Sequence, residues 1–396
     1  MRVAAVAFVG ALVGAAAVLG IGWGAGLVHR GSTTRTVVVH ELPAAASHPA
    51  AVRTVIGSLQ RGFSPARIFA LRSPGVVTVF TYFGDGTAAQ GSGFVVSPAG
   101  TILTNAHVIT TAGETVPGAK VRPASRIYVE FSDHDRIPAT IVGWDVYDDV
   151  GVIRVASSQH ALDPLPLGRS SAVVVGEPVA AIGSPLGNEN SLAVGVVSAV
   201  GRSIAALTAA HFQLVDAIQT DAPITHGSSG GPLLDGRGRV IGINAQIRSD
   251  AGGSSGIGFA VPIDSARRSL DDLLANGRVA YAYAGLQTQD LTAALARHLG
   301  LPVLHGALVE HVTPGGPAAH AGIRGGSKEI EFEGESLVTG GDVVVSVDGV
   351  PVPDADSLVR IVTINLRPGQ TALFGIVRAG ARHTVAVRLT ERPPGS

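Results

Sequence analysis

Three polar residues, in three separate segments, have the types needed for acyl transfer by a serine. His107 follows the apolar run 101–104, Asp149 directly precedes the apolar run 150–153, and Ser229 lies in a glycine-rich segment. A serine hydroxyl is a weak nucleophile that needs a neighbouring base, and the base needs an orienting carboxylate. We therefore interpret Ser229 as the nucleophile, His107 as the base and Asp149 as the orienting acid.

Each of these residues also has a simpler structural interpretation when it is taken alone. His107 is one of 13 histidines, most of which are expected to be structural or solvated. An aspartate before a strand commonly caps a turn, a role that Asp148 would fill as well as Asp149. The glycines around Ser229 allow tight backbone that presents a side chain and directs amides at an oxyanion, but such a run also suits an ordinary turn.

The composition excludes several classes of function. There are no cysteines, which excludes disulfides, thiolate catalysis and cysteine-based metal sites. The 29 basic and 30 acidic residues leave almost no net charge, so we expect no nucleic-acid partner. The triad chemistry needs no metal or other cofactor, and we expect none. With 52 glycines and only 5% aromatic residues, the chain suits turn-rich β structure.

The segment 3–28 contains no charged residue and is almost entirely apolar. About 20 such residues span a bilayer, so the pattern predicts a transmembrane anchor rather than a cleaved signal peptide, whose apolar core is shorter. Arg2 on one side and Arg30 and Arg35 on the other barely distinguish the two orientations. The segment 29–64 is rich in Ala, Pro, Ser and Thr without periodicity, and it predicts a flexible linker.

From residue 65 onward, short apolar runs bounded by Gly, Pro and Asp predict an all-β domain of many strands. The periodicity of 265–276, followed by Asn276-Gly277, predicts a helix that closes this domain at 277. Residues 281–392 alternate short strands with two helical stretches, 291–299 and 356–364, which indicates a separate small α+β module. Within it, we interpret the acidic stretch 325–339 as an inserted, solvated loop.

The motifs around the three residues resemble those of the HtrA/Deg serine proteases. The matching segments are Thr104-Asn105-Ala106-His107-Val108, Asp149-Val150-Gly151-Val152-Ile153, Gln219-Thr220-Asp221-Ala222-Pro223-Ile224, Gly227-Ser228-Ser229-Gly230-Gly231-Pro232-Leu233, Ile241-Gly242-Ile243-Asn244 and Gly256-Ile257-Gly258-Phe259-Ala260-Val261-Pro262. The His, Asp, Ser order is that of the chymotrypsin class. The resemblance implies a mainly β, chymotrypsin-like protease domain of two six-stranded barrels at 65–277, with the active site between the barrels.

The resemblance also implies further site residues. Amides of Gly227 and Ser229 would form the oxyanion hole, and Ile224 and Ile257 would line a pocket for small aliphatic side chains; barrel core is the alternative for both isoleucines. The chain departs from the family pattern just before the nucleophile. His226 and Ser228 stand where the family usually has proline and asparagine. These changes suggest a less settled oxyanion hole.

The module at 281–392 resembles a PDZ domain of the HtrA type through Val312-Thr313-Pro314-Gly315-Gly316-Pro317-Ala318, Gly341-Asp342-Val343-Val344 and Val347-Asp348-Gly349-Val350-Pro351-Val352. Such a module binds an extended C-terminal peptide at a sheet edge. The resemblance assigns the carboxylate-binding loop to Tyr283, Ala284, Gly285 and Leu286. A packing domain that binds no peptide is the alternative.

The combined interpretation is a membrane-anchored serine endopeptidase with one PDZ domain, acting outside the cytosol on misfolded or regulatory proteins. The family tends to form trimers near the start of the protease domain, where Phe63 and Phe69 are candidates for the contact. Two alternatives remain. The chain would be a non-catalytic scaffold or chaperone if the substitutions at 225, 226 and 228 abolish turnover. It would be a cytosolic protease if the anchor has the opposite orientation.

Overall fold

The computed structural model of the chain describes residues 62–113, 121–184, 190–205, 213–225, 227–245 and 257–393. The predicted anchor at 3–28 lies outside these residues, as does almost all of the predicted linker at 29–64. Within the described ranges, no helix combines the length and the apolar character that crossing a membrane requires. All the described residues belong to one compact unit, Gln60–Ser396.

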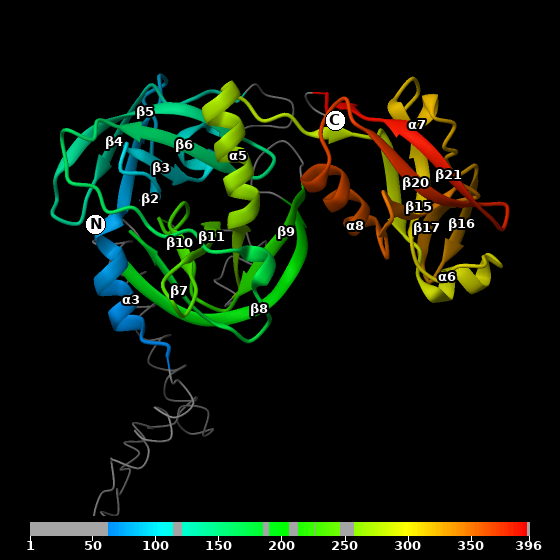
Figure 1. Cartoon of the computed structure of the whole chain (residues 1–396), viewed down its shortest axis with the longest axis horizontal. Coiled ribbons are helices and arrows are strands. Elements are labelled where there is room, and N and C mark those ends of the chain that lie inside the picture. The colour runs from blue at the N-terminus through cyan, green and yellow to red at the C-terminus, as the bar shows by residue number, and fades with distance from the viewer. Residues whose placement is uncertain are drawn as a thin grey trace, which may run out of the picture. The chain divides into compact units, whose positions relative to one another are not determined.

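Six antiparallel strands form the first closed barrel, in the order β1-β2-β3-β6-β5-β4 (Figure 1). The strands are β1 Val76–Tyr82, β2 Ala88–Val95, β3 Thr101–Thr104, β4 Arg126–Glu130, β5 Arg136–Asp145 and β6 Val150–Val155. Helix α3 (Pro65–Arg72) precedes the barrel, and the one-turn helix α4 (Ala106–Ile109) follows β3. Successive side chains of a strand point to opposite faces, so Val77 and Val79 pack in the core of this barrel while Val76 joins the core that lies between the barrels.

The second barrel repeats this architecture in the order β10-β11-β12-β9-β8-β7. Its strands are β7 Pro178–Gly183, β8 Ser191–Ala205, β9 Gln213–Thr220, β10 Pro232–Leu234, β11 Val240–Ala245 and β12 Gly258–Pro262. One continuous cluster of buried side chains joins the two barrels, with Phe94 and Leu103 from the first packed with Ile182 and Ile243 from the second. The two barrels are therefore joined by a shared core.

Helix α5 (Ile263–Asn276) follows β12 and packs against strands of both barrels, as Figure 1 shows. Its buried side chains include Ala266, Leu270 and Leu273, which recur at helical spacing. It ends where Gly277 adopts a φ of +69° and donates its amide to Leu273 O at 3.0 Å, a C-cap that glycine favours. The helix predicted at 265–276 thus forms with two more residues at its start, and the mainly β fold with two six-stranded barrels is confirmed.

The C-terminal module is built on a sheet in the order β14-β15-β18-β20-β21, with β19 paired to β18. These strands are β14 Leu286–Asp290, β15 Ala307–Val312, β18 Val343–Val347, β19 Val350–Pro351, β20 Thr371–Arg378 and β21 Ala381–Arg388, and a short pair joins β13 Ala282–Tyr283 to β22 Thr390–Glu391. Its helices are α6 Ala293–His298, α7 Pro317–His320 and α8 Ala355–Arg360, and α8 continues into a π-helical turn at Ile361–Asn365. The α+β organisation expected from the sequence is therefore present.

The inserted loop predicted at 325–339 is wrong in its conformation. This segment forms an antiparallel hairpin of β16 (Lys328–Phe332) and β17 (Glu335–Thr339). Glutamates alternate with Ile330 and Phe332, which pack with Leu337 against a core cluster of the module while the glutamates stay exposed. The many glutamates indicated a solvated loop, whereas the two-residue alternation is the pattern of a half-buried strand.

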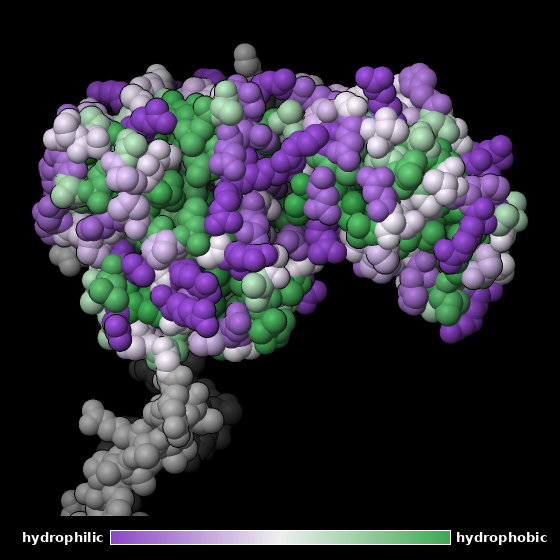
Figure 2. Space-filling model, viewed as in Figure 1, coloured by the Kyte–Doolittle hydropathy of each residue, from purple (hydrophilic) through white to green (hydrophobic). Residues whose placement is uncertain are grey.

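On the face of the molecule drawn in Figure 2, hydrophobic and hydrophilic residues are interspersed.

Candidate active site

His107 lies on the one-turn helix α4, directly after β3 ends. The two residues before His107 are hydrogen-bonded to the turn before β6. Asn105 Nδ2 and Ala106 N both donate to Asp149 O, at 2.8 and 3.2 Å. Asn105 is fully buried, so its amide has no water to bond instead. These bonds fix the segment that carries His107 relative to Asp149, independently of the contact between the two side chains.

Asp149 uses both carboxylate oxygens to hold His107. Oδ2 lies 2.7 Å from His107 Nδ1, and Oδ1 accepts from His107 N at 3.0 Å. Asp149 is buried and has a φ of +50°, an uncommon backbone conformation for a residue with a side chain. A carboxylate that accepts from Nδ1 keeps the proton on that nitrogen and leaves Nε2 as the basic one.

The environment of His107 shifts its pKa upward. Burial lowers the pKa of the imidazole because it disfavours the charged form, but the charge of Asp149 and the hydrogen bond to it together outweigh burial. The side chain retains 17% exposure, so one edge of the ring stays accessible. An accessible imidazole with a raised pKa is suited to accept a proton from a nucleophile near neutral pH.

Ser229 lies in the segment between β9 and β10, and a residue of the first barrel holds its backbone there. Ser92, in β2, donates its amide to Ser229 O at 2.7 Å and its hydroxyl to Gly227 O at 2.6 Å. On the second barrel, Gly230 N donates to Asn244 O at 2.9 Å. The segment around Ser229 is therefore bonded to both barrels.

Three glycines make this close approach possible. Gly227 and Gly230 have φ values of +92° and +87°, which side chains rarely adopt, and a Cβ on Gly230 would lie 2.0 Å from Ser92 O. A Cβ on Gly91 would lie 2.6 Å from Val108, next to His107, and 3.1 Å from Ser229 O. Val108 of the His107 helix and the Ser229 carbonyl therefore both lie against Gly91, which makes the helix that carries His107 and the Ser229 backbone near neighbours.

Comparison with known proteins agrees with this architecture. Residues 91–243 match the model of the trypsin-like peptidase domain, and residues 282–389 match that of the PDZ domain. The HtrA-type protease AlgW, solved with a tripeptide, superposes with a TM-score of 0.67 at 32% identity, covering 84% of this chain and 98% of that one. The chain belongs to the HtrA/DegP family of serine proteases.

Two curated members of the family show how far the similarity extends. The putative serine protease HhoA of a Synechocystis species is 40% identical over 283 residues, which cover 69% of this chain and 64% of HhoA. A probable periplasmic DegP-like serine endoprotease of Pseudomonas fulva is 38% identical over 303 residues, covering 76% of this chain and 56% of that protein. The chain thus spans about 56% to 64% of the length of these two relatives.

Of the three departures from the HtrA pattern, those at 226 and 228 have different outcomes in the structure. His226 lies outside the described residues. Ser228 donates its amide to Thr225 O at 2.9 Å and accepts from Gly231 N at 3.1 Å, and its Cα lies where a Cβ on Gly183 would approach to 2.8 Å. A serine is thus accommodated against β7 within a tight turn. The amides of Gly227 and Ser229 remain the predicted oxyanion donors.

The two residues predicted for the substrate pocket have different environments. Ile224 is nearly buried, and its Cδ1 atom would lie 2.8 Å from a Cβ on Gly258, so it packs against the start of β12. Ile257 directly precedes Gly258 and is 52% exposed. Ile224 therefore has the contacts of a wall or core residue, whereas Ile257 is open to a ligand.

The loop predicted to bind a peptide carboxylate precedes the edge strand of the PDZ sheet. Gly285 has a φ of +74°, and its carbonyl accepts from Thr313 N at 2.9 Å, while Ala284 O accepts from Ala318 N at 2.9 Å. Tyr283 Oη lies 3.0 Å from Thr313 Oγ1. Strand β14, which begins at Leu286, is paired on one side only and contacts α8, so it leaves an edge and a helix for an added strand.

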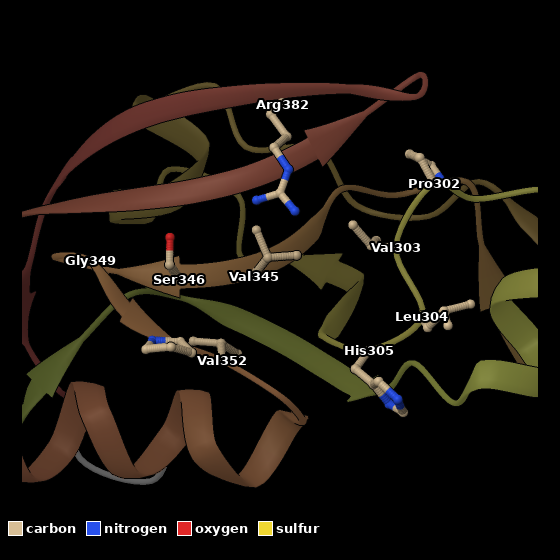
Figure 3. A pocket seen from close by; sticks show the side chains of 10 residues that line it. Pro302, Val303, Leu304, His305, Val345, Ser346, Gly349, Val352 and Arg382 are labelled. Atoms are coloured by element: carbon tan, nitrogen blue, oxygen red, sulfur yellow. The ribbon is translucent and has the colours of Figure 1, made fainter.

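A separate hollow of about 580 Å³ lies in the C-terminal module and contains none of the residues predicted for catalysis or peptide binding. In Figure 3, the Arg382 side chain of β21 points toward Val345 of β18, with Leu304 and His305 along another side. This hollow offers no base paired with a nucleophile. In the described parts of the chain, no group of three or more His, Asp or Glu residues is placed to hold a metal ion.

Ser92 was missed in the sequence although its hydrogen bonds join the two barrels. It is fully buried, and Thr104 Oγ1 donates to its carbonyl at 2.6 Å. The available signal was a hydroxyl between two glycines, Gly91 and Gly93, in a strand with apolar residues after it. Glycine inside a strand often marks close approach of another backbone, and here that backbone carries the predicted nucleophile.

Proposed function

We propose that this chain is a serine endopeptidase in which Ser229 is the nucleophile, His107 the general base and Asp149 the orienting acid. The observation that carries the proposal is the contact of both Asp149 carboxylate oxygens with His107, beside a Ser229 segment bonded to both barrels. The order and the roles match those of the triad in chymotrypsin-like enzymes.

The chemistry proceeds by a covalent intermediate. Ser229 Oγ attacks the carbonyl carbon of the scissile peptide, and its proton moves to Nε2 of His107. The tetrahedral oxyanion accepts hydrogen bonds from the amides of Gly227 and Ser229, which stabilise charge that develops in the transition state. His107 then protonates the leaving amine, the C–N bond breaks, and water hydrolyses the acyl-enzyme by the same base. Asp149 stabilises the imidazolium in both steps.

The substrate pocket is proposed to accept small aliphatic side chains at the position before the scissile bond. Ile257 offers exposed apolar surface, and Ile224 packs against Gly258, the next residue and the start of β12. The substrates proposed are misfolded or regulatory proteins outside the cytosol, because the Pseudomonas relatives are described as periplasmic endoproteases. Membrane attachment by 3–28 and a trimer involving Phe63 and Phe69 remain proposals from the sequence. Both phenylalanines pack partly against the protease core.

The PDZ domain is proposed to bind the C-terminal ends of peptides. An extended peptide would pair with the free edge of β14 beside α8, and its carboxylate would meet the loop at Tyr283–Leu286. Solved structures of AlgW contain a tripeptide or a decapeptide, which supports this class of ligand.

A fluorophosphonate probe tests the catalytic proposal directly. We expect labelling of the wild-type chain and loss of labelling in Ser229→Ala, with a loss of peptidase activity of about 10⁶-fold. Circular dichroism and peptide binding by the PDZ domain control for folding. A well-folded wild-type chain that binds peptide and is not labelled would instead support the non-catalytic scaffold or chaperone, which the departures from the family pattern at 225, 226 and 228 favour.

A further inference from the structure

The turn that carries Asp149 is short, and one buried carboxylate organises it. Asp145 ends β5 and pairs across the sheet with Val150, the first residue of β6, so only four residues separate the paired positions. Asp149 is the last of these residues and has a φ of +50°. A non-glycine residue in this region persists only where its surroundings hold it there.

The carboxylate of Asp145 accepts several of the hydrogen bonds that hold this turn in place. Its Oδ1 atom accepts from Tyr147 N at 3.0 Å and, more weakly, from Asp148 N at 3.5 Å. Both amides belong to the turn, so these bonds stabilise it internally. Its Oδ2 atom accepts from Ser269 Oγ of α5 at 2.7 Å and from Tyr281 Oη at 2.5 Å. Asp145 retains only 3% exposure. Burial raises the pKa of its carboxyl above the ordinary value, and the hydrogen bonds from Tyr281 and Ser269 oppose this rise, so these donors rather than water stabilise the charged form.

The partners of Asp145 are fixed in their turn. Ser269 is fully buried on α5, and this helix approaches β5 so closely that a Cβ on Gly143 would lie 2.8 Å from Leu273. Tyr281 is buried, and burial, with the charges of Asp145 and Asp148, raises its pKa well above the ordinary value, so its hydroxyl keeps the proton that it donates. The turn is therefore anchored to a rigid helix and to a buried phenol.

We propose that Asp145 is a positioning residue for catalysis: its carboxylate fixes the turn that presents Asp149 to His107 and anchors this turn to Ser269 and Tyr281. The inference rests on the proposed triad and adds to it a second carboxylate that never touches substrate. If Asp149 moves relative to His107, the imidazole loses orientation and the charge that raises its pKa, while the burial that lowers the pKa remains.

The test compares four variants of the full chain, with activity expressed per active site titrated by a fluorophosphonate probe. We expect Asp145→Ala to lower kcat about 100-fold, the cost of misplacing a catalytic group. Asp145→Asn keeps an acceptor for the Tyr147 amide and should lose about tenfold, and Tyr281→Phe and Ser269→Ala, which each remove one donor, should lose less. KM should change little, because Asp145 lies behind the triad.

The acidic limb of kcat/KM gives the readout that a purely structural role would not change. In Asp145→Asn and Asp145→Ala it should move to lower pH, because the pKa of His107 falls when Asp149 is displaced. Burial is the largest cause that raises the pKa of Asp148 to about 7, and the charge of Asp145 is the second. We therefore compare kcat at pH 8.5 and above, where Asp148 is ionised.

Asp133→Asn is the matched control. Asp133 Oδ1 also accepts from a turn amide, that of Asp135, at 3.1 Å, but this turn is on an exposed hairpin.

The outcomes separate the inference from the function on which it rests. If the wild type shows no turnover that depends on Ser229, the proposed function fails. If the wild type is active, and the folded variants, Tyr281→Phe included, keep its titrated kcat and its acidic limb while only melting temperature or active fraction falls, Asp145 is merely structural and the inference is overturned. Should Asp145→Ala not fold, Asp145→Asn and Tyr281→Phe still decide between the two.

Discussion

The two barrels hold their parts of the candidate site by different means. In the first, His107 and Asp149 are joined by direct contacts between a ring, a carboxylate and one amide, and the carbonyl of Asp149 accepts two further bonds. In the second, Ser229 is held through its backbone, by bonds from Ser92 and through glycines that leave no room for a methyl group. The placement of His107 and Asp149 thus depends on charge, whereas the placement of Ser229 depends on close packing of the backbone.

This difference predicts different consequences of mutation. Changing charge in the first barrel should alter the pKa of His107 and the rate while leaving the fold intact. Changing volume in the second barrel should displace the segment around Ser229, and it should therefore affect stability and rate together. The variants below test this contrast, from the largest expected effect to the smallest.

Asp149→Asn should produce the largest loss, about 10⁴-fold in kcat, because an amide that donates to Nδ1 favours the wrong imidazole tautomer. The pH profile also tests the direction in which the pKa of His107 is shifted. His107 must be neutral to act as a base, and the charge and hydrogen bond of Asp149 raise its pKa, so the wild-type acidic limb should lie above the ordinary imidazole value. In the variant burial alone remains, and the limb should move to lower pH. An unmoved limb would show that the charge of Asp149 does not set this pKa.

Gly230→Ala tests the contribution of shape in the second barrel. A Cβ would lie 2.0 Å from Ser92 O in a backbone with a φ of +87°. We expect a destabilisation of about 3 to 4 kcal/mol, measured by chemical denaturation, together with a kcat reduced at least tenfold per folded molecule.

Gly86→Ala is the matched control for this variant. Gly86 has the same φ of +87°, but no atom lies within 4 Å of its Cβ position. It should cost only the backbone strain, about 1 kcal/mol, without a loss of kcat. Equal effects of the two substitutions would mean that strain, and not the contact with Ser92, determines the cost at Gly230.

Much of this arrangement was predictable from the sequence, because motifs and strand patterns are local. The strands, the helix ending at Gly277 and the three polar residues each have a signal within a few residues of the chain. What the sequence did not reveal depends on contacts between distant segments. Ser92 bonds to the Ser229 segment across 137 positions of sequence, and Asp145 bonds to Tyr281 across 136. Neither residue type is unusual where it stands, and only the fold shows what each one faces.

The misinterpreted segment at 325–339 has another physical cause. Its glutamates dominate the composition, so a solvated loop was expected. Strand pairing depends instead on which residues alternate, and Ile330, Phe332 and Leu337 supply an apolar face that the module buries. Periodicity was the better guide than net charge, and the same holds for α5, whose helical spacing predicted it correctly.

Of the three variants aimed at the site itself, Ser92→Ala should have the smallest effect, and it addresses the link between the two halves. The variant removes the hydroxyl that donates to Gly227 O at 2.6 Å and accepts from Ser184 N at 2.9 Å, but it retains the backbone bond to Ser229 O. The amide of the buried Ser184 and the carbonyl of the half-buried Gly227 then lose a partner, at a cost of about 1 to 3 kcal/mol in stability and up to about tenfold in kcat. Ser125→Ala removes a comparable hydroxyl bond, to Tyr82 O at 2.8 Å on the surface, and should change stability by less than about 0.5 kcal/mol. A normal kcat in Ser92→Ala would mean that backbone and shape alone hold the Ser229 segment, whereas a reduced kcat would show that the second half of the site also depends on a side chain of the first.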